Sequence, residues 1–206
     1  MKKIVFFIAL LAALPAMAND GYSYETRDNY VGIRLHKNER ISFAYDIRDG
    51  SSATVKKDNF GFGAYIGNQL TDFLKIEFET MYTGVEDSRH NINFDYDIWS
   101  NMVNVYLFRE YGYAVSPYVG MGIGFSTIWA DIGGISPDMR DTKFDLSYAA
   151  MIGVNFALNE RIDLNLGFKY QKYGDIEHKI NGNVYADTDA DATEFYIGAA
   201  YKFGLK

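Results

Sequence analysis

The feature that most constrains this chain is an alternation of apolar and polar residues that recurs along its length. Between Lys143 and Ala157 every second residue is apolar or small. These residues are Phe144, Leu146, Tyr148, Ala150, Ile152, Val154 and Phe156. Successive side chains of a strand point to opposite faces, so an alternation of this length predicts a β-strand with one apolar face.

Eight segments show this pattern, some of them with irregularities. They are residues 30–45, 60–67, 74–83, 99–107, 118–129, 143–157, 162–171 and 193–203. Short connections (68–73, 109–116, 158–161) alternate with long polar ones (46–58, 84–97, 131–142, 172–191). Short turns at one end and long loops at the other are typical of outer-membrane barrels. The fold class we predict is therefore all-β: an eight-stranded antiparallel up-and-down transmembrane β-barrel.

Alternation alone does not say which face points outward, because a soluble lipocalin-like barrel turns its apolar face inward. Here the polar face is rich in glycine and carries charges that can pair inside a narrow barrel: Arg34, Glu77, Glu79, Asp163, Lys169, Glu194 and Lys202. Aromatic residues gather near both ends of the apolar face. We place Tyr45, Phe60, Tyr82, Trp99, Trp129 and Phe144 near the long loops, and Tyr30, Phe73, Phe108, Phe156 and Phe203 near the short turns. Two aromatic girdles favour a lipid-facing outer surface.

The first predicted strand contains a conflict. Its alternation places Lys37 and Glu39 on the same face as Val31, Ile33 and Ile41. A lysine at mid-bilayer depth on the lipid face costs about 2–4 kcal/mol. Either a bulge near residues 36–40 or an early exit of the strand from the membrane would remove this cost.

The N-terminus predicts export. Lys2 and Lys3 precede an apolar run from Ile4 to Leu14, and Ala16-Met17-Ala18 resembles a cleavage site, so we predict a signal peptide over residues 1–18 and a barrel domain over residues 19–206. Without Lys2 and Lys3 the formal net charge changes from −7 to −9, which is unfavourable for nucleic-acid binding. The chain has no cysteine, so neither disulfides nor a lipoprotein anchor can hold it.

Several short strings resemble the opacity-protein group of small outer-membrane barrels. They are Tyr30-Val31 with residues 39–42, Asn104-Val105-Tyr106, residues 117–120, and Glu194 with Gly198, Tyr201 and Phe203. The resemblance covers the strands and none of the long loops. It implies an eight-stranded barrel that the outer-membrane assembly machinery inserts, with loops that bind host or environmental partners. The group usually ends on its final aromatic residue, whereas here Gly204-Leu205-Lys206 follow Phe203.

Signs of catalysis or of a metal site are sparse. The histidines are His36, His90 and His178, and no G-x-S-x-G motif is present, so we expect no enzyme, no catalytic residues and no cofactor. Glu77 and Glu79 share a face and could form a carboxylate dyad, but a buried ion-pair network with Arg34 and Lys169 is the interpretation we favour. The acidic segment 187–194 resembles the start of a calcium loop. However, Ala192 stands where a calcium loop has its glycine, and Gly198 stands where it has its final glutamate. We therefore expect no metal site.

Two functional classes remain. The first is a surface protein, a monomer surrounded by outer-membrane lipid, whose four polar loops serve adhesion or another surface interaction. The second is a small passive porin-like channel or purely structural barrel, although eight strands leave a lumen that side chains can fill. A lipid-modifying enzyme is a third alternative. In each case we expect the protein in the bacterial outer membrane.

Overall fold

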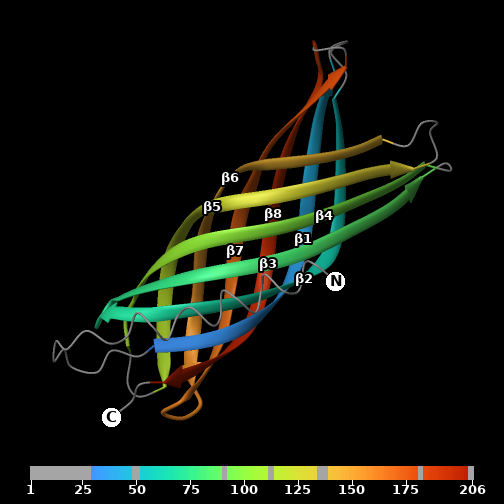
Figure 1. The fold of residues 1–206 in the computed structure, drawn as a ribbon. Helices are drawn as coiled ribbons and strands as arrows, with labels where there is room; N and C mark the ends of the chain where they lie inside the picture. Colours follow the sequence, from blue (N-terminus) through green and yellow to red (C-terminus); the bar gives the residue numbers. More distant parts are fainter. Residues whose placement is uncertain are drawn as a thin grey trace.

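The computed structural model describes residues 29–47, 52–89, 92–110, 114–133, 139–180 and 183–203. These ranges hold eight strands, drawn as arrows in Figure 1. They are β1 (Asn29–Ile47), β2 (Ser52–Thr71), β3 (Leu74–Arg89), β4 (Ile92–Phe108), β5 (Val115–Gly133), β6 (Met139–Ala157), β7 (Ile162–Ile180) and β8 (Asn183–Phe203). No helix in these ranges has the length and apolar character needed to cross a membrane. The predicted signal peptide lies outside the described residues and stays a prediction.

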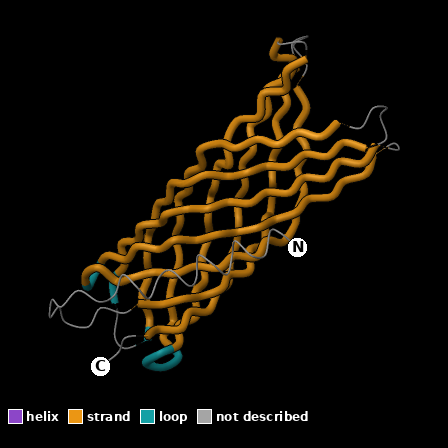
Figure 2. The backbone as a smooth tube through the Cα atoms, in the orientation of Figure 1, coloured by secondary structure: helices purple, strands orange, loops and turns teal. Residues whose placement is uncertain are grey.

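The strands form one closed barrel in chain order, and all neighbouring pairs are antiparallel. The barrel closes where β1 pairs with β8, from Asn29 opposite Phe203 upward. In Figure 2 the strands surround the barrel interior without a break. The predicted eight-stranded up-and-down barrel is therefore confirmed.

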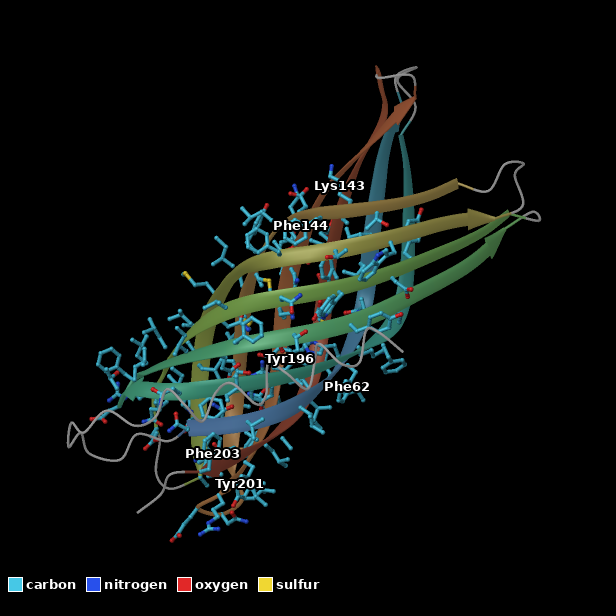
Figure 3. All side chains as sticks on the ribbon, in the orientation of Figure 1. Phe62, Lys143, Phe144, Tyr196, Tyr201 and Phe203 are labelled. Atoms are coloured by element: carbon cyan, nitrogen blue, oxygen red, sulfur yellow. The ribbon has the colours of Figure 1, made fainter. Side chains whose placement is uncertain are left out.

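The apolar face points outward, as predicted. Large apolar side chains such as Phe62 and Phe144 are more than half exposed, whereas Tyr196 lies inside the barrel (Figure 3). The outward alternation also holds for Phe60, Phe73, Tyr82 and Phe203 of the predicted girdles. It follows that the barrel has an apolar outer belt.

Two predicted girdle residues were placed on the wrong face. Tyr30 and Phe108 are buried in the barrel interior. Tyr30 has the parity of Arg34, and Phe108 that of Tyr106, and both of these point inward. The alternation of the strand therefore predicts the face of a side chain better than its aromatic character does, because the backbone fixes which face each residue occupies. Tyr45 was also assigned to a girdle, but its side chain lies outside the described part.

The first strand contains a bulge just after Lys37. The pairing with β2 shifts between Asn38 and Ile41, and the pairing with β8 shifts between Asn38 and Arg40. One extra residue at such a point changes which residues lie opposite each other. Of the two alternatives left open for residues 36–40, the structure therefore contains the bulge. Lys37, just before it, remains on the outer surface and is exposed.

The segments predicted as long polar loops are mostly strand. The β3–β4 ladder runs to Arg89 opposite Ile92, and the β7–β8 ladder runs to Ile180 opposite Asn183. The connections themselves span only residues 48–51, 90–91, 134–138 and 181–182. Backbone pairing does not need an apolar face, so a strand can continue after the alternation that marks the lipid belt has ended. Four long hairpins therefore stand where four loops were expected.

Two of the eight strand pairings are shorter than the others, so the strands at the long-hairpin end of the barrel separate into two groups. Pairing of β2 with β3 stops at Gly61 opposite Thr83, and pairing of β6 with β7 stops at Tyr148 opposite Lys172. The remaining ladders continue outward. The outer parts of β7, β8, β1 and β2 form a first arm, and those of β3, β4, β5 and β6 form a second arm. Figure 1 shows the tips of the two arms well separated.

Candidate functional site

Polar side chains join the two arms at the points where the ladders end. Between β2 and β3, the Asn59 amide donates to the Thr83 hydroxyl and to the Gly84 carbonyl oxygen, each at 2.8 Å. Between β6 and β7, the Ser147 hydroxyl donates to the Tyr173 carbonyl oxygen at 3.0 Å. These bonds satisfy backbone groups that no longer have a strand partner. The division into arms is thus a stabilised part of the fold.

Gly174 lies at the second of these junctions. Its φ of +127° is unfavourable for residues with a Cβ, and an added Cβ would approach Asp145 to 2.5 Å. The β7–β8 register shifts between Lys172 and Gly174, so a bulge turns β7 away from β6 here. Glycine is required at the position where the first arm departs.

The barrel interior contains the predicted network of ion pairs. Arg34 of β1 is 2% exposed, and its two terminal nitrogens lie 2.8 Å from Glu77 and 2.9 Å from Glu79, both on β3. Lys169 of β7 lies 3.5 Å from Glu79. All four predicted members therefore meet, and the ion-pair interpretation of the two glutamates is confirmed.

The network extends beyond those four residues. Lys169 lies 3.3 Å from Glu194 of β8, and Nδ1 of the fully buried His36 lies 2.8 Å from the same carboxylate. The Tyr173 hydroxyl donates to Glu194 at 2.6 Å. Sequence reasoning considered His36 only as a possible catalytic base. Its parity with Arg34 was the signal that could have placed it in this network.

The cluster contains three carboxylates, from Glu77, Glu79 and Glu194, and two basic side chains, from Arg34 and Lys169. A buried charge is tolerated only when it is paired and hydrogen-bonded. The arrangement ties β1, β3, β7 and β8 together across the lumen.

Apolar and aromatic side chains fill the lumen on both sides of the charges. Toward the arms lies a buried layer of Met81, Tyr96, Ile98, Ile128, Tyr173, Ala190 and Ala192. On the other side lie the inward tyrosines, including the predicted Tyr65, Tyr106, Tyr118 and Tyr196. A pocket near the short turns, bordered by Lys75 and Asp163, has room for about one water molecule. The described interior is therefore filled by side chains, as expected for eight strands.

Five of the inward tyrosines each lie over a glycine on the neighbouring strand. The directly opposed pairs are Tyr30–Gly67, Tyr65–Gly32, Tyr106–Gly120, Tyr118–Gly153 and Tyr196–Gly167. A Cβ on any of these glycines would come within 2.3–2.5 Å of the paired tyrosine. Glycine thus provides the space that an aromatic ring needs inside a narrow barrel, and this pairing depends on the register between strands.

We expect no steady conductance when the folded protein is reconstituted in planar bilayers. The apolar layer around Ile98 and Ile128 and the charge cluster below it leave no continuous aqueous path through the described barrel. Single-channel recordings, with a sixteen-stranded porin as the positive control, test this expectation. Reproducible openings with one stable unit conductance would contradict it.

The segment that resembled a calcium loop does not form one with Glu194. This glutamate points into the lumen, where it binds His36 and Tyr173. The side chains of Asp187 and Asp189 lie outside the described part. Among the residues that the structure describes, no group of three or more His, Asp or Glu side chains could hold a metal ion.

A closed barrel with an apolar outer belt and a charged, filled interior defines a membrane-spanning β-barrel protein. The chain belongs to the outer membrane protein beta-barrel domain family, whose model matches residues 6–203. It is accordingly a protein of the bacterial outer membrane, as predicted. The expected resemblance to small outer-membrane barrels is confirmed.

Comparison with individual proteins gives the same class. Outer membrane protein PagN of Salmonella typhimurium is 25% identical over 179 residues, which cover 71% of this chain and 74% of PagN. Neisserial surface protein A has 18% identity and a TM-score of 0.61, covering 87% of this chain and 100% of that chain. Ail, the attachment invasion locus protein of Yersinia pestis, crystallised with the heparin analogue sucrose octasulfate, has 16% identity and a TM-score of 0.54, with the same coverage. These two structures support the fold.

Proposed function

We propose that this protein is a monomeric surface interaction protein, an adhesin, whose barrel anchors two extracellular arms in the outer membrane. The observation that carries the proposal is the contrast between the two parts of the barrel. The described lumen is filled with side chains, whereas six of the eight ladders continue beyond the apolar belt as two separate arms. A partner that cannot enter the lumen has the arms as its main contact surface.

A structural relative supports this role. Ail carries attachment in its name and was crystallised with a heparin analogue. We assign the present chain no catalytic step, because the described contacts of His36 go to the carboxylates of Glu79 and Glu194 and not to a nucleophile. Recognition of host or environmental molecules by the arms needs no cofactor.

Shortening each arm along its ladder tests the proposal. In the second arm, residues 85–96 and 131–140 are removed, and two-residue turns join Gly84 to its partner Asp97 and Ala130 to its partner Asp141. In the first arm, residues 175–189 and 45–53 are removed, and Gly174 is joined in the same way to Ala190 and Ala44 to Thr54. We expect bacteria that carry the doubly shortened protein to adhere to epithelial cells and matrix components no better than bacteria without it.

The control shortens the opposite end. Residues 158–161, the connection between β6 and β7, are replaced by a two-residue turn, and adhesion should stay at the level of the intact protein. Slower migration on gels after boiling than before it shows for each variant that the barrel has assembled. If the doubly shortened protein assembles and supports full adhesion, the arms are not the contact surface and the proposal fails.

A further inference from the structure

The outer part of β2 is paired with a neighbouring strand on one side only. Its ladder with β1 continues out to Ser52 opposite Asp46, whereas its ladder with β3 stops at Gly61 opposite Thr83. Within the described residues, the positions from Ser52 to Phe60 therefore have no strand neighbour on the β3 side. This open edge is about 30 Å long at the usual rise of a strand. The unpaired main-chain groups of such an edge are a template for another extended chain.

A hydrogen bond shows which main-chain groups of β2 face this opening. The Thr83 hydroxyl donates to the Phe60 carbonyl oxygen at 3.2 Å, so the main-chain groups of Phe60 point toward β3. A residue in an antiparallel strand directs its N–H and C=O to one side, and its neighbours direct theirs to the other side. Every second residue from Phe60 outward, beginning with Asp58, therefore presents one donor and one acceptor to the opening.

The base of the opening is short of hydrogen-bond donors. The side chains of Asn38, Asn59 and Thr83 form three hydrogen bonds among themselves. Their two remaining donor hydrogens go to the carbonyl oxygens of Phe60 and Gly84. The buried Oδ1 of Asn38 still has no partner among the described residues. Because the amide of Asn59 already takes the place of a main-chain donor at Gly84, the opening suits a ligand that brings further amide N–H groups.

The other open edges of the arms are better protected. The bulge at Gly174 turns the edge of β7 away, and such bulges commonly protect edge strands. On β6 the Asp145 carboxylate accepts from the main-chain N–H of Leu146 at 2.7 Å, so an acidic side chain covers the start of that edge. β3 continues only from Gly84 to Arg89 beyond its ladder with β2. Among the described contacts, the edge of β2 is therefore the longest without such protection.

We propose that the open edge of β2 binds an extended, basic segment of a partner polypeptide, which adds to the first arm as a further strand. A polypeptide main chain offers donors and acceptors at the spacing of a strand edge, and strand addition is an established mode of peptide recognition. Asp58 is exposed at this edge, and the whole chain has a formal net charge of −7, so a positively charged segment is favoured. The inference rests on the proposed function, because it takes the arms as the contact surface and assigns the chemical class of the partner.

A nine-residue peptide of alternating lysine and threonine tests the edge. The peptide carries a fluorophore and is titrated onto the folded protein in detergent, with binding measured by fluorescence anisotropy. We expect saturable binding, because main-chain hydrogen bonds supply the affinity in strand addition. The same peptide N-methylated at every residue keeps all its side chains but loses its main-chain donors, and it should not bind measurably.

Replacing Asp58 with proline tests the protein side of the contact. Asp58→Pro removes a main-chain N–H from the open edge, at a residue that has no direct partner on β1. The affinity for the unmodified peptide should fall about tenfold, as for the loss of one hydrogen bond. The matched control is Asp58→Asn, which removes the same charge but keeps the N–H, and it should weaken binding at most about fivefold. A heat-dependent gel shift confirms that each variant is folded.

Several outcomes would overturn the proposal. They are no binding of the unmodified peptide, equal binding of the two peptides, and equal affinities of the two Asp58 variants. A concentration-dependent dimer that Asp58→Pro abolishes would instead assign the edge to a second copy of the chain.

The adhesion assay separates this inference from the proposed function. Bacteria that carry Asp58→Pro should adhere less well than bacteria with the parent protein. If the shortened arms abolish adhesion while Asp58→Pro leaves it intact, the arms remain the contact surface but the edge of β2 does not bind the partner, and this inference alone fails. If the shortened arms leave adhesion intact, the proposed function itself fails.

Discussion

Replacing Arg34 with methionine is expected to lower the free energy of unfolding by about 3–5 kcal/mol, as for a buried ion pair that loses one partner. Methionine retains much of the side-chain volume, so the change removes mainly charge and hydrogen bonds. Glu77 would keep only its 3.0 Å bond from the Tyr30 hydroxyl among its described side-chain contacts. Urea unfolding of protein refolded into lipid vesicles, followed by tryptophan fluorescence, measures the loss.

The double variant Arg34→Met, Glu77→Gln provides the control. Glutamine needs no cation and can still accept the bond from Tyr30, so the double variant should be more stable than Arg34→Met alone. Lys202→Met removes a cation from a less buried pair, 3.0 Å from Asp163, and should have a smaller effect than Arg34→Met. An Arg34→Met protein as stable as the parent would show that the network contributes nothing to stability.

The second large effect is expected from Gly167→Val, which should cost about 3 kcal/mol, the upper end of the range for overpacking. The first added carbon would lie 2.5 Å from the Tyr196 ring and 2.8 Å from the Tyr118 hydroxyl. Tyr196 would have to move, and its 2.6 Å hydrogen bond with Tyr118 would break. The same vesicle-based urea unfolding gives the change in stability.

A double-mutant cycle with Tyr196→Ala separates this clash from other effects. Tyr196→Ala alone leaves a cavity and should cost about 3–5 kcal/mol, by analogy with other large aromatic truncations. In the double variant the valine occupies part of the vacated space, so the combined loss should be smaller than the sum of the single losses. Additivity within about 0.5 kcal/mol would show that residues 167 and 196 do not interact.

Much of the barrel could be predicted from the sequence, because the period of two is a property of the backbone itself. Parity alone placed Arg34, Glu77, Glu79 and Lys169 on the inner face, and all four lie there. The errors at Tyr30 and Phe108 arose because their aromatic character, and not the alternation, was used to place them at the membrane interface. The conflict at Lys37 indicated either a bulge or an early exit of the strand from the membrane, and only the structure distinguished them.

The sequence by itself therefore determined that there are eight strands, which face each presents within the apolar belt, and the membrane in which the barrel lies, because each strand's alternation is local. It did not determine how far the strands extend beyond the belt. Only the tertiary structure decided which inward residues meet. The contacts of Tyr196 with Gly167 and of His36 with Glu194 join residues on different strands, and their meeting depends on the register of one strand against the next. The two arms likewise follow from ladders that end at Thr83 and Tyr148. Register is a non-local property, set by how all eight strands close the barrel together.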